Sequence, residues 1–231
     1  MDDPEDEVEI EMDAATVAAL ADSGCRLHGF VAVRCADAAG RPLLWLHTDH
    51  YAMTTRVRAP SGWEAYTSTQ ALEEGAPVRP GCHAPATLGH TLVAREPRSG
   101  EVLEMGSAGE ISILNDTPTQ LTCGLAAVGS GAPAPVFAVP LYGGFLQRVT
   151  PLRTLFLFFS SAPAEAGTAI AEATGPGVLV DLDTPAERRL RFHINQGWSC
   201  DEPGHARRVA AGSELRPLLI APPATRTQAP S

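Results

Sequence analysis

Four histidines in the first half of the chain are the residues best suited to metal chemistry. The chain of 231 residues contains seven histidines, and these four are His47, His50, His83 and His90. Imidazole is the commonest protein ligand for zinc, copper and iron, so three or four of these side chains meeting at one point would make a site for a divalent transition metal. The alternative is that all four lie in turns and on the surface without meeting.

The spacing of these histidines resembles the pattern of the cupin family. The segment 47–50 (HTDH) ends a predicted strand, and the segment 80–83 (PGCH) lies in a later loop. In cupins, a strand with spaced histidines and a later P-x-G-x-x-H element hold a metal inside a jelly roll. The resemblance implies a small metal-dependent enzyme that orients an oxygen-containing substrate or O₂. The chain departs from the family in its H-x-x-H spacing, in the missing glutamate and in its shorter second element.

A polar stripe near the end of the chain is a second candidate site. On a strand over 189–194, Arg191, His193 and Asn195 share one face, and the residues between them are apolar. These three side chains, with Trp198 after the following tight turn, are predicted to bind a ligand. The alternative is a solvent-facing strand whose apolar residues face the core, with Trp198 packed across the end of the sandwich.

Signatures of nucleophilic, phosphate-binding and zinc-protease chemistry are missing from the sequence. Cys82 and His83 form the only adjacent Cys–His pair, and nothing marks a third group that would orient them. There is no G-x-S-x-G, no Walker loop and no HExxH. The sequence alone therefore does not decide between an enzyme and a binding protein.

The net charge of −10 is concentrated at the start of the chain. Eight acidic residues among the first 13 account for −8, which leaves −2 for everything after them. Residues 1–12 are therefore predicted to form a disordered acidic arm. A nearly neutral body without a basic patch argues against nucleic acid as a partner.

Cysteine usage and hydropathy predict a cytoplasmic protein without a membrane span. The five cysteines are scattered, odd in number and never spaced as CxxC, which is typical of reduced thiols. The first residues lack the basic and apolar regions of a secretory signal. No apolar stretch reaches the length of about 18 residues that a membrane span needs.

The elements that must position these residues are short strands joined by turns. Leu155–Phe159 is an unbroken apolar run between turn-forming residues, which predicts a strand covered on both faces. Strand patterns recur roughly every 9–12 residues in the second half, which favours an all-β, antiparallel, jelly-roll-like sandwich. A short helix is expected over Asp13–Ala21, capped by Asp13 and ended by Gly24.

Composition shifts suggest how the chain is divided. After the arm, residues 13–106 are predicted as an N-terminal β-rich unit and 107–200 as a C-terminal β-sandwich unit, with a polar, proline-rich tail over 201–231. One large sandwich fits the strand pattern nearly as well.

Two classes of function follow. The first is a non-catalytic binding or assembly module for a small molecule or a protein partner, which includes assembly as a homo-oligomer. The second is the metal-dependent jelly-roll enzyme that uses the four histidines. Sandwich folds host both classes, so the site must distinguish them.

Overall fold

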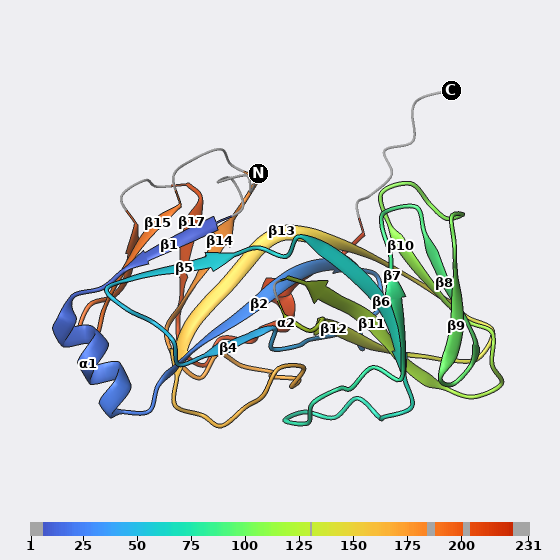
Figure 1. Cartoon of the computed structure of the whole chain (residues 1–231), viewed down its shortest axis with the longest axis horizontal. Coiled ribbons are helices and arrows are strands. Elements are labelled where there is room, and N and C mark those ends of the chain that lie inside the picture. The colour runs from blue at the N-terminus through green and yellow to red at the C-terminus, as the bar shows by residue number, and fades with distance from the viewer. Residues whose placement is uncertain (1–6, 130, 184–187, 201–203, 224–231) are drawn as a thin grey trace.

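The computed structural model describes residues 7–129, 131–183, 188–200 and 204–223. These residues form eighteen strands and two short helices, and the strands are arranged in three sheets (Figure 1). The predicted all-β, sandwich-like fold is confirmed. No helix in the described part of the chain is long and apolar enough to cross a membrane.

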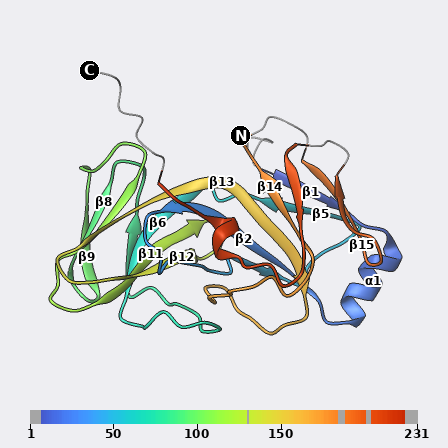
Figure 2. The same cartoon turned by 180° about the vertical axis from the view of Figure 1, so that it is seen from behind.

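The nine-stranded sheet is the largest of the three sheets. At its centre the long strand β13 (Leu146–Ser160) runs antiparallel to β2 (Arg26–Cys35), and the two cross the molecule together (Figures 1 and 2). The other strands of this sheet are β4 (Leu46–Thr48), β8 (Thr91–Glu96), β9 (Ser99–Leu103), β10 (Ile111–Asn115), β14 (Gly177–Asp181), β17 (Ala206–Val209) and β18 (Ile220–Ala221).

A five-stranded sheet packs against the nine-stranded sheet. Leu125 and Phe137 of this sheet belong to the same buried cluster as Val31 and Leu157 of the nine-stranded sheet, so the two sheets share one core. The strands of the five-stranded sheet, in spatial order, are β3 (Arg41–Pro42), β12 (Ala134–Leu141), β11 (Leu121–Val128), β6 (Gly62–Ser68) and β7 (Cys82–Pro85).

A four-stranded sheet lies at one end of the molecule, next to α1 (Figure 1). Its central strand β1 pairs in parallel with β15 and antiparallel with β5. In spatial order the strands are β16 (Gly197–Cys200), β15 (Arg189–His193), β1 (Glu7–Glu11) and β5 (Thr54–Arg58).

The apolar run Leu155–Phe159 is buried on both faces of its strand, as predicted. Each residue of Leu155–Phe159 is at most 6 % exposed. Leu155, Leu157 and Phe159 face the large core, whereas Phe156 and Phe158 face a second cluster on the other side of the sheet. The alternation of a strand therefore divides this run between two cores.

β13 is longer than the sequence suggests. Two separate strands over 145–149 and 154–160 are expected on either side of Pro151, but the structure has one strand of 15 residues. Pro151 has no N–H to donate to a neighbouring strand, and the pairing with β2 shifts register between Pro151 and Leu155. The strand accommodates the proline through this irregularity instead of ending there.

The predicted N-terminal helix is present as α1 (Ala14–Asp22). Asp13 is its N-cap, because its side chain accepts a hydrogen bond of 2.6 Å from the backbone N–H of Thr16. Gly24 follows the helix with a φ of 64°, a left-handed conformation that favours glycine. The second helix, α2 (Arg216–Leu219), is a single turn in a part of the chain that was expected to be a tail.

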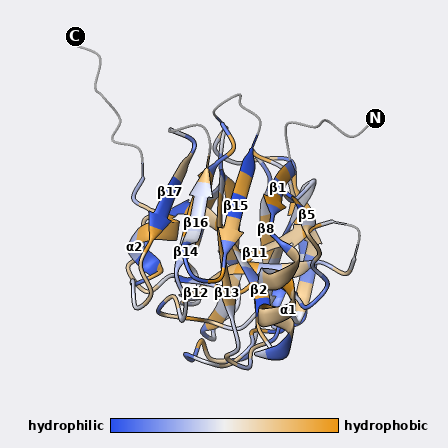
Figure 3. Ribbon diagram, turned by 90° about the vertical axis from the view of Figure 1, so that its left-hand side faces the viewer, coloured by the Kyte–Doolittle hydropathy of each residue, from blue (hydrophilic) through white to orange (hydrophobic). Residues whose placement is uncertain are grey.

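The prediction of a disordered acidic arm over 1–12 is wrong for residues 7–12, and residues 1–6 lie outside the described part. Glu7–Glu11 forms β1, the central strand of the four-stranded sheet, which faces the viewer in Figure 3. Val8 and Ile10 are 0 % exposed. The glutamates that alternate with them point to the other face, so the segment is an amphipathic strand.

The predicted division into units is not followed by the sheets. Each of the three sheets combines strands from both sides of the boundary at 106/107. The prediction of a tail over 201–231 is wrong for residues 206–221, where β17, α2 and β18 join or pack against the nine-stranded sheet. Residues 201–203 and 224–231 lie outside the described part.

Candidate functional site

The first pair of predicted metal ligands lies on and after β4. The Nε2 atom of His47 is 2.7 Å from a guanidinium nitrogen of Arg26, and it accepts that hydrogen bond when His47 is neutral. Burial and the Arg26 charge lower the pKa of His47, and Asp49 opposes this. His50 is almost fully exposed, with its side chain 96 % accessible. The two imidazoles thus have different surroundings.

The second pair of predicted ligands lies on other elements. His83, on the edge strand β7, is 2.6 Å from a carboxylate oxygen of Glu64 on the neighbouring strand. His90 is 3.1 Å from the hydroxyl of Thr87 in its own loop. No three His, Cys, Asp or Glu side chains among the described residues form a group that could hold a metal ion. The four histidines therefore do not converge.

His28 is a buried imidazole that the sequence reading missed. It is 1 % exposed and packs against His47 and Phe158, with ring centroids 5.1 and 5.2 Å apart. Neither of its ring nitrogens has a hydrogen-bond partner within the described residues. Burial, with smaller contributions from His47 and Arg26, lowers the pKa of His28 to about 4, so the ring is neutral at pH 7.

The residues of the predicted ligand-binding stripe contact one another and neighbouring residues of the protein. Arg191 forms an ion pair of 3.1 Å with Glu11, and His193 lies 3.5 Å from Asp13. Asn195 lies in the turn after β15, where its backbone N–H donates to Nδ1 of His193. The stripe thus helps to hold β15 beside β1 and α1.

Trp198, the fourth predicted ligand-binding residue, lies in the core. It is 2 % exposed and stacks on Phe159 with ring centroids 5.6 Å apart. Its indole N–H donates to the carbonyl of Pro176 at 2.9 Å. The structure therefore does not offer this side chain to a ligand, and its predicted packing across the end of the sandwich fits its contacts.

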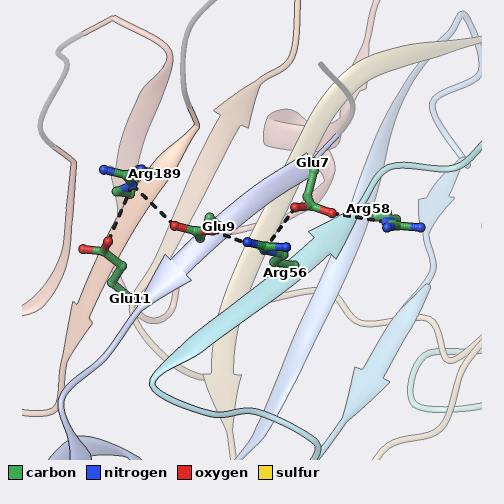
Figure 4. A network of polar contacts seen from close by, with 6 residues as sticks. All are labelled: Glu7, Glu9, Glu11, Arg56, Arg58 and Arg189. Atoms are coloured by element: carbon green, nitrogen blue, oxygen red, sulfur yellow. Dashed lines mark hydrogen bonds and ion pairs between the residues drawn. The ribbon is translucent and has the colours of Figure 1, made fainter. Parts of the chain in front are cut away.

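The outward face of the four-stranded sheet carries a network of ion pairs (Figure 4). Glu9 of β1 lies between Arg56 of β5, at 3.2 Å, and Arg189 of β15, at 3.4 Å. Glu7 accepts a hydrogen bond from Arg58 at 3.1 Å. We call the outward side chains of Glu7, Glu9, Glu11, Arg56, Arg58 and Arg189 the charged face. In this face a central strand of glutamates is flanked on both sides by arginines.

A groove with a volume of about 1050 Å³ adjoins the charged face. It is lined by β4 and the residues around it, by β5 and the turn after it, and by the connection between β11 and β12. The groove is bordered by half-buried apolar side chains, including Trp45 and Leu46, and by the charged side chains of Arg56 and Arg58. Ligand sites are typically concave and mostly apolar, with a few polar groups.

Residues of β5 line this groove without a gap in the sequence. Seven consecutive residues, Thr55–Ser61, contribute to the lining, and the first four belong to β5. Successive side chains of a strand point to opposite faces, so four in a row cannot all point into one groove. The backbone edge of β5 itself therefore borders the groove.

That edge of β5 has no partner strand among the described residues. β5 pairs only with β1. The strand β4, which also lines the groove, pairs only with β2. The open edge of β5 thus borders the groove, while β4 contributes Leu46 and Thr48 to its lining. Of the predicted site residues only His50 lines it. The alternation of apolar and polar residues over 52–58 predicts a half-exposed strand, but no local pattern signals which of its edges stays open.

The turn between β12 and β13 is a second exposed feature. Tyr142 and Phe145 are both 63 % exposed, with ring centroids 6.4 Å apart. Gly144, between them, has a φ of 77° that favours glycine in this turn. Exposed aromatic side chains often mark interaction surfaces, so this turn is a second candidate contact surface.

Comparison with known proteins adds no relative to this picture: no family model matches the chain, and neither a curated protein nor a solved structure is significantly similar to it. The groove, the charged face and their contacts are therefore the basis for inferring function.

Proposed function

We propose that the protein is a non-catalytic binding module that holds a small molecule or a segment of a protein partner in the groove between β4 and β5. The observation that carries this proposal is the consecutive lining by Thr55–Ser61, which brings open backbone donors and acceptors to a concave surface. Backbone groups at an open strand edge are ready to bind a ligand without any rearrangement of the fold.

The side chains around the groove support the same proposal. Trp45 and Leu46 provide apolar contact area, while Arg56, Arg58 and His50 provide charge and hydrogen-bond donors. Such a mixture gives a ligand both desolvated contacts and a fixed orientation. The metal-dependent alternative lacks a comparable observation, because its four histidines have separate partners and positions.

A cytoplasmic location is part of this proposal. All five cysteines are free thiols, and three of them are buried. Unpaired thiols are typical of proteins that work in a reducing compartment.

The test is a ligand screen with a blocked groove. A mixture of small metabolites and short peptides is screened by saturation-transfer NMR against the natural protein and two variants. Ala132→Trp places an indole at an exposed position that lines the groove. Ala211→Trp adds the same side chain at an exposed position that does not line the groove.

We expect ligands whose binding is lost in Ala132→Trp and retained in Ala211→Trp, and which mass spectrometry recovers unchanged after incubation. Ligands that bind equally well to both variants would place the site elsewhere. Failure of every compound to bind, or chemical conversion of the bound ones, would contradict a binding module of this kind.

A further inference from the structure

Building on the proposed function, we infer that the groove takes an extended acidic peptide segment of a protein partner, which adds as a β-strand to the open edge of β5. In this mode of recognition main-chain hydrogen bonds provide affinity and alternate side chains provide specificity. The backbone edge of β5 borders the groove, as the unbroken lining by Thr55–Arg58 indicates.

Several other edge strands carry a feature that blocks a further strand, and β5 carries none of these features, whereas β16 and β17 also lack them but have only four residues each. Open edges are usually protected by proline, by irregular pairing or by being very short. β3 contains Pro42 and β7 ends in Pro85, so each lacks a backbone donor. β9 is joined to β8 through a shifted register, and β4 has only three residues.

By contrast, β5 has five residues, contains no proline, and pairs with β1 in an unbroken register. Five residues of strand extend for about 17 Å. This edge is therefore long enough to align a short peptide.

β1, which pairs with the other edge of β5, indicates which sequence of strand the open edge of β5 would bind. β1 reads EVEIE, and its Glu7 and Glu9 form ion pairs with Arg56 and Arg58. The same two guanidinium-bearing side chains line the groove, where they are 63 % and 70 % exposed. Opposite charges on neighbouring strands are favourable, so a peptide with alternating acidic residues matches this edge.

The charge of the groove favours the same occupant. The charged residues that line it are Arg56, Arg58 and Glu7, together with the titratable His50. Their sum is positive, while the protein as a whole carries −10. Arg56 and Arg58 therefore offer positive charge to an acidic segment in a protein that is acidic overall, in addition to their pairing with Glu7 and Glu9. Leu46 and Trp45 would contact the aliphatic residues that alternate with the acids of that segment.

The probe that tests this inference copies the strand that β5 already binds. It is the acetylated and amidated peptide Gly-Glu-Val-Glu-Ile-Glu-Gly, and its binding to the full chain is measured by fluorescence anisotropy or calorimetry. We expect saturable binding with a Kd below about 1 mM, and about tenfold weaker binding to Ala132→Trp but not to Ala211→Trp. A peptide with arginines in place of the three glutamates should bind at least about tenfold more weakly.

Two N-methylated forms of the peptide test whether it binds as a strand. Methylation of alternate amides removes the N–H donors along one edge of the peptide only. A strand that binds in one direction with its acidic face outward turns only one of its edges toward β5, so one form should lose about tenfold or more in affinity and its alternate should bind nearly normally. Hydrogen exchange at residues 54–58 should slow on binding, while exchange in the edge strand β7 should not change.

Three results would overturn the inference: no saturable binding of the acidic peptide, equal binding of the two N-methylated forms, or unchanged hydrogen exchange in β5. If small molecules still bind in a manner that Ala132→Trp blocks, the proposed binding function survives without peptide recognition. If neither peptides nor small molecules bind, both proposals fail.

Discussion

The charged face of the four-stranded sheet and the apolar half of β13 are both built on strands, but different forces hold them. Phe156 and Phe158 are 0 % exposed, and Phe158 stacks on Phe30 at 6.0 Å. Burial of one such side chain contributes about 1.5–3 kcal/mol. The ion pairs of the charged face are solvated, and an exposed pair contributes only about 0–1 kcal/mol.

Apolar burial along β13 mainly stabilises the fold, whereas the ion pairs of the charged face mainly specify how β1 pairs with its neighbours. The apolar half of β13 would stabilise many similar packings, because hydrophobic burial has no direction. The charged face is selective, because β1 carries only glutamates on its outward side and both neighbours carry arginines there. A shift of register by one residue would turn these charges toward the core, so the pattern fixes how β1 is inserted.

Phe156→Ala tests the apolar side of this contrast and should have the largest effect. Loss of a fully buried phenyl ring removes apolar contacts and leaves a cavity, so the free energy of unfolding should fall by about 3–5 kcal/mol. Urea denaturation measures the change. Phe145→Ala, at the exposed turn, is the matched control and should change stability by less than about 0.5 kcal/mol. Similar effects of the two variants would contradict the assigned burial.

Acidification should weaken the same apolar region through His28. The pKa of His28 is about 4 in the folded protein, below its ordinary value of 6.5, so the unfolded chain binds the proton first. Stability is therefore greatest above pH 6.5 and falls as the pH drops toward 4, by about 3 kcal/mol for this group. His47, whose pKa is also lowered, acts in the same direction.

His28→Leu should remove most of this dependence between pH 6.5 and 4, as measured by urea denaturation across that range. The leucine variant provides its own control at pH 7.5, where His28 is neutral in both states. An unchanged slope in the variant would mean that another group titrates.

Asp13→Ala tests the junction between the charged face and α1. Loss of the hydrogen bond to the N–H of Thr16 should lower the melting temperature by about 2–4 °C. Asp13→Asn keeps an acceptor at the cap and should lower it less. Scanning calorimetry compares the two, and equal losses would show that charge, and not capping, is what Asp13 contributes.

Glu9→Gln should have the smallest effect, although Glu9 contacts arginines on both sides. The arginines of both pairs are exposed to solvent, so the free energy of unfolding should change by less than about 1 kcal/mol, and the change should vanish at about 1 M NaCl. Urea denaturation at low and high salt measures both quantities. A large effect that persists at high salt would remove the contrast between the two regions.

Much of the fold is predictable from local patterns. The apolar run Leu155–Phe159, the hairpin of β8 and β9 and the cap of α1 all follow from neighbouring residues, because strand alternation, turns and caps are local properties. The acidic composition of β1 concealed an alternation of glutamates with Val8 and Ile10 that was itself a strand signal.

The candidate site was less predictable because it depends on which strands do not pair. The groove is lined by residues of β4 and β5, each of which pairs along one edge only among the described residues, and strand pairing is set by contacts between distant segments. The four histidines lie apart for a related reason. His47 and His83 are separated onto different sheets, and no spacing within the sequence encodes that separation.

The parallel pairing of β1 with β15 has a consequence for how the protein is made. Glu11 and Arg191 are 180 residues apart in the chain. At about 5–20 residues per second, β1 waits about 9–36 s during translation before β15 is synthesised, although β5 is available to it much earlier. Throughout that interval one edge of β1 is open and the core that covers Val8 and Ile10 is incomplete. Alternating charges such as its glutamates are the kind of residue that disfavours aggregation of an exposed strand, so we expect them to protect β1 until β15 is synthesised.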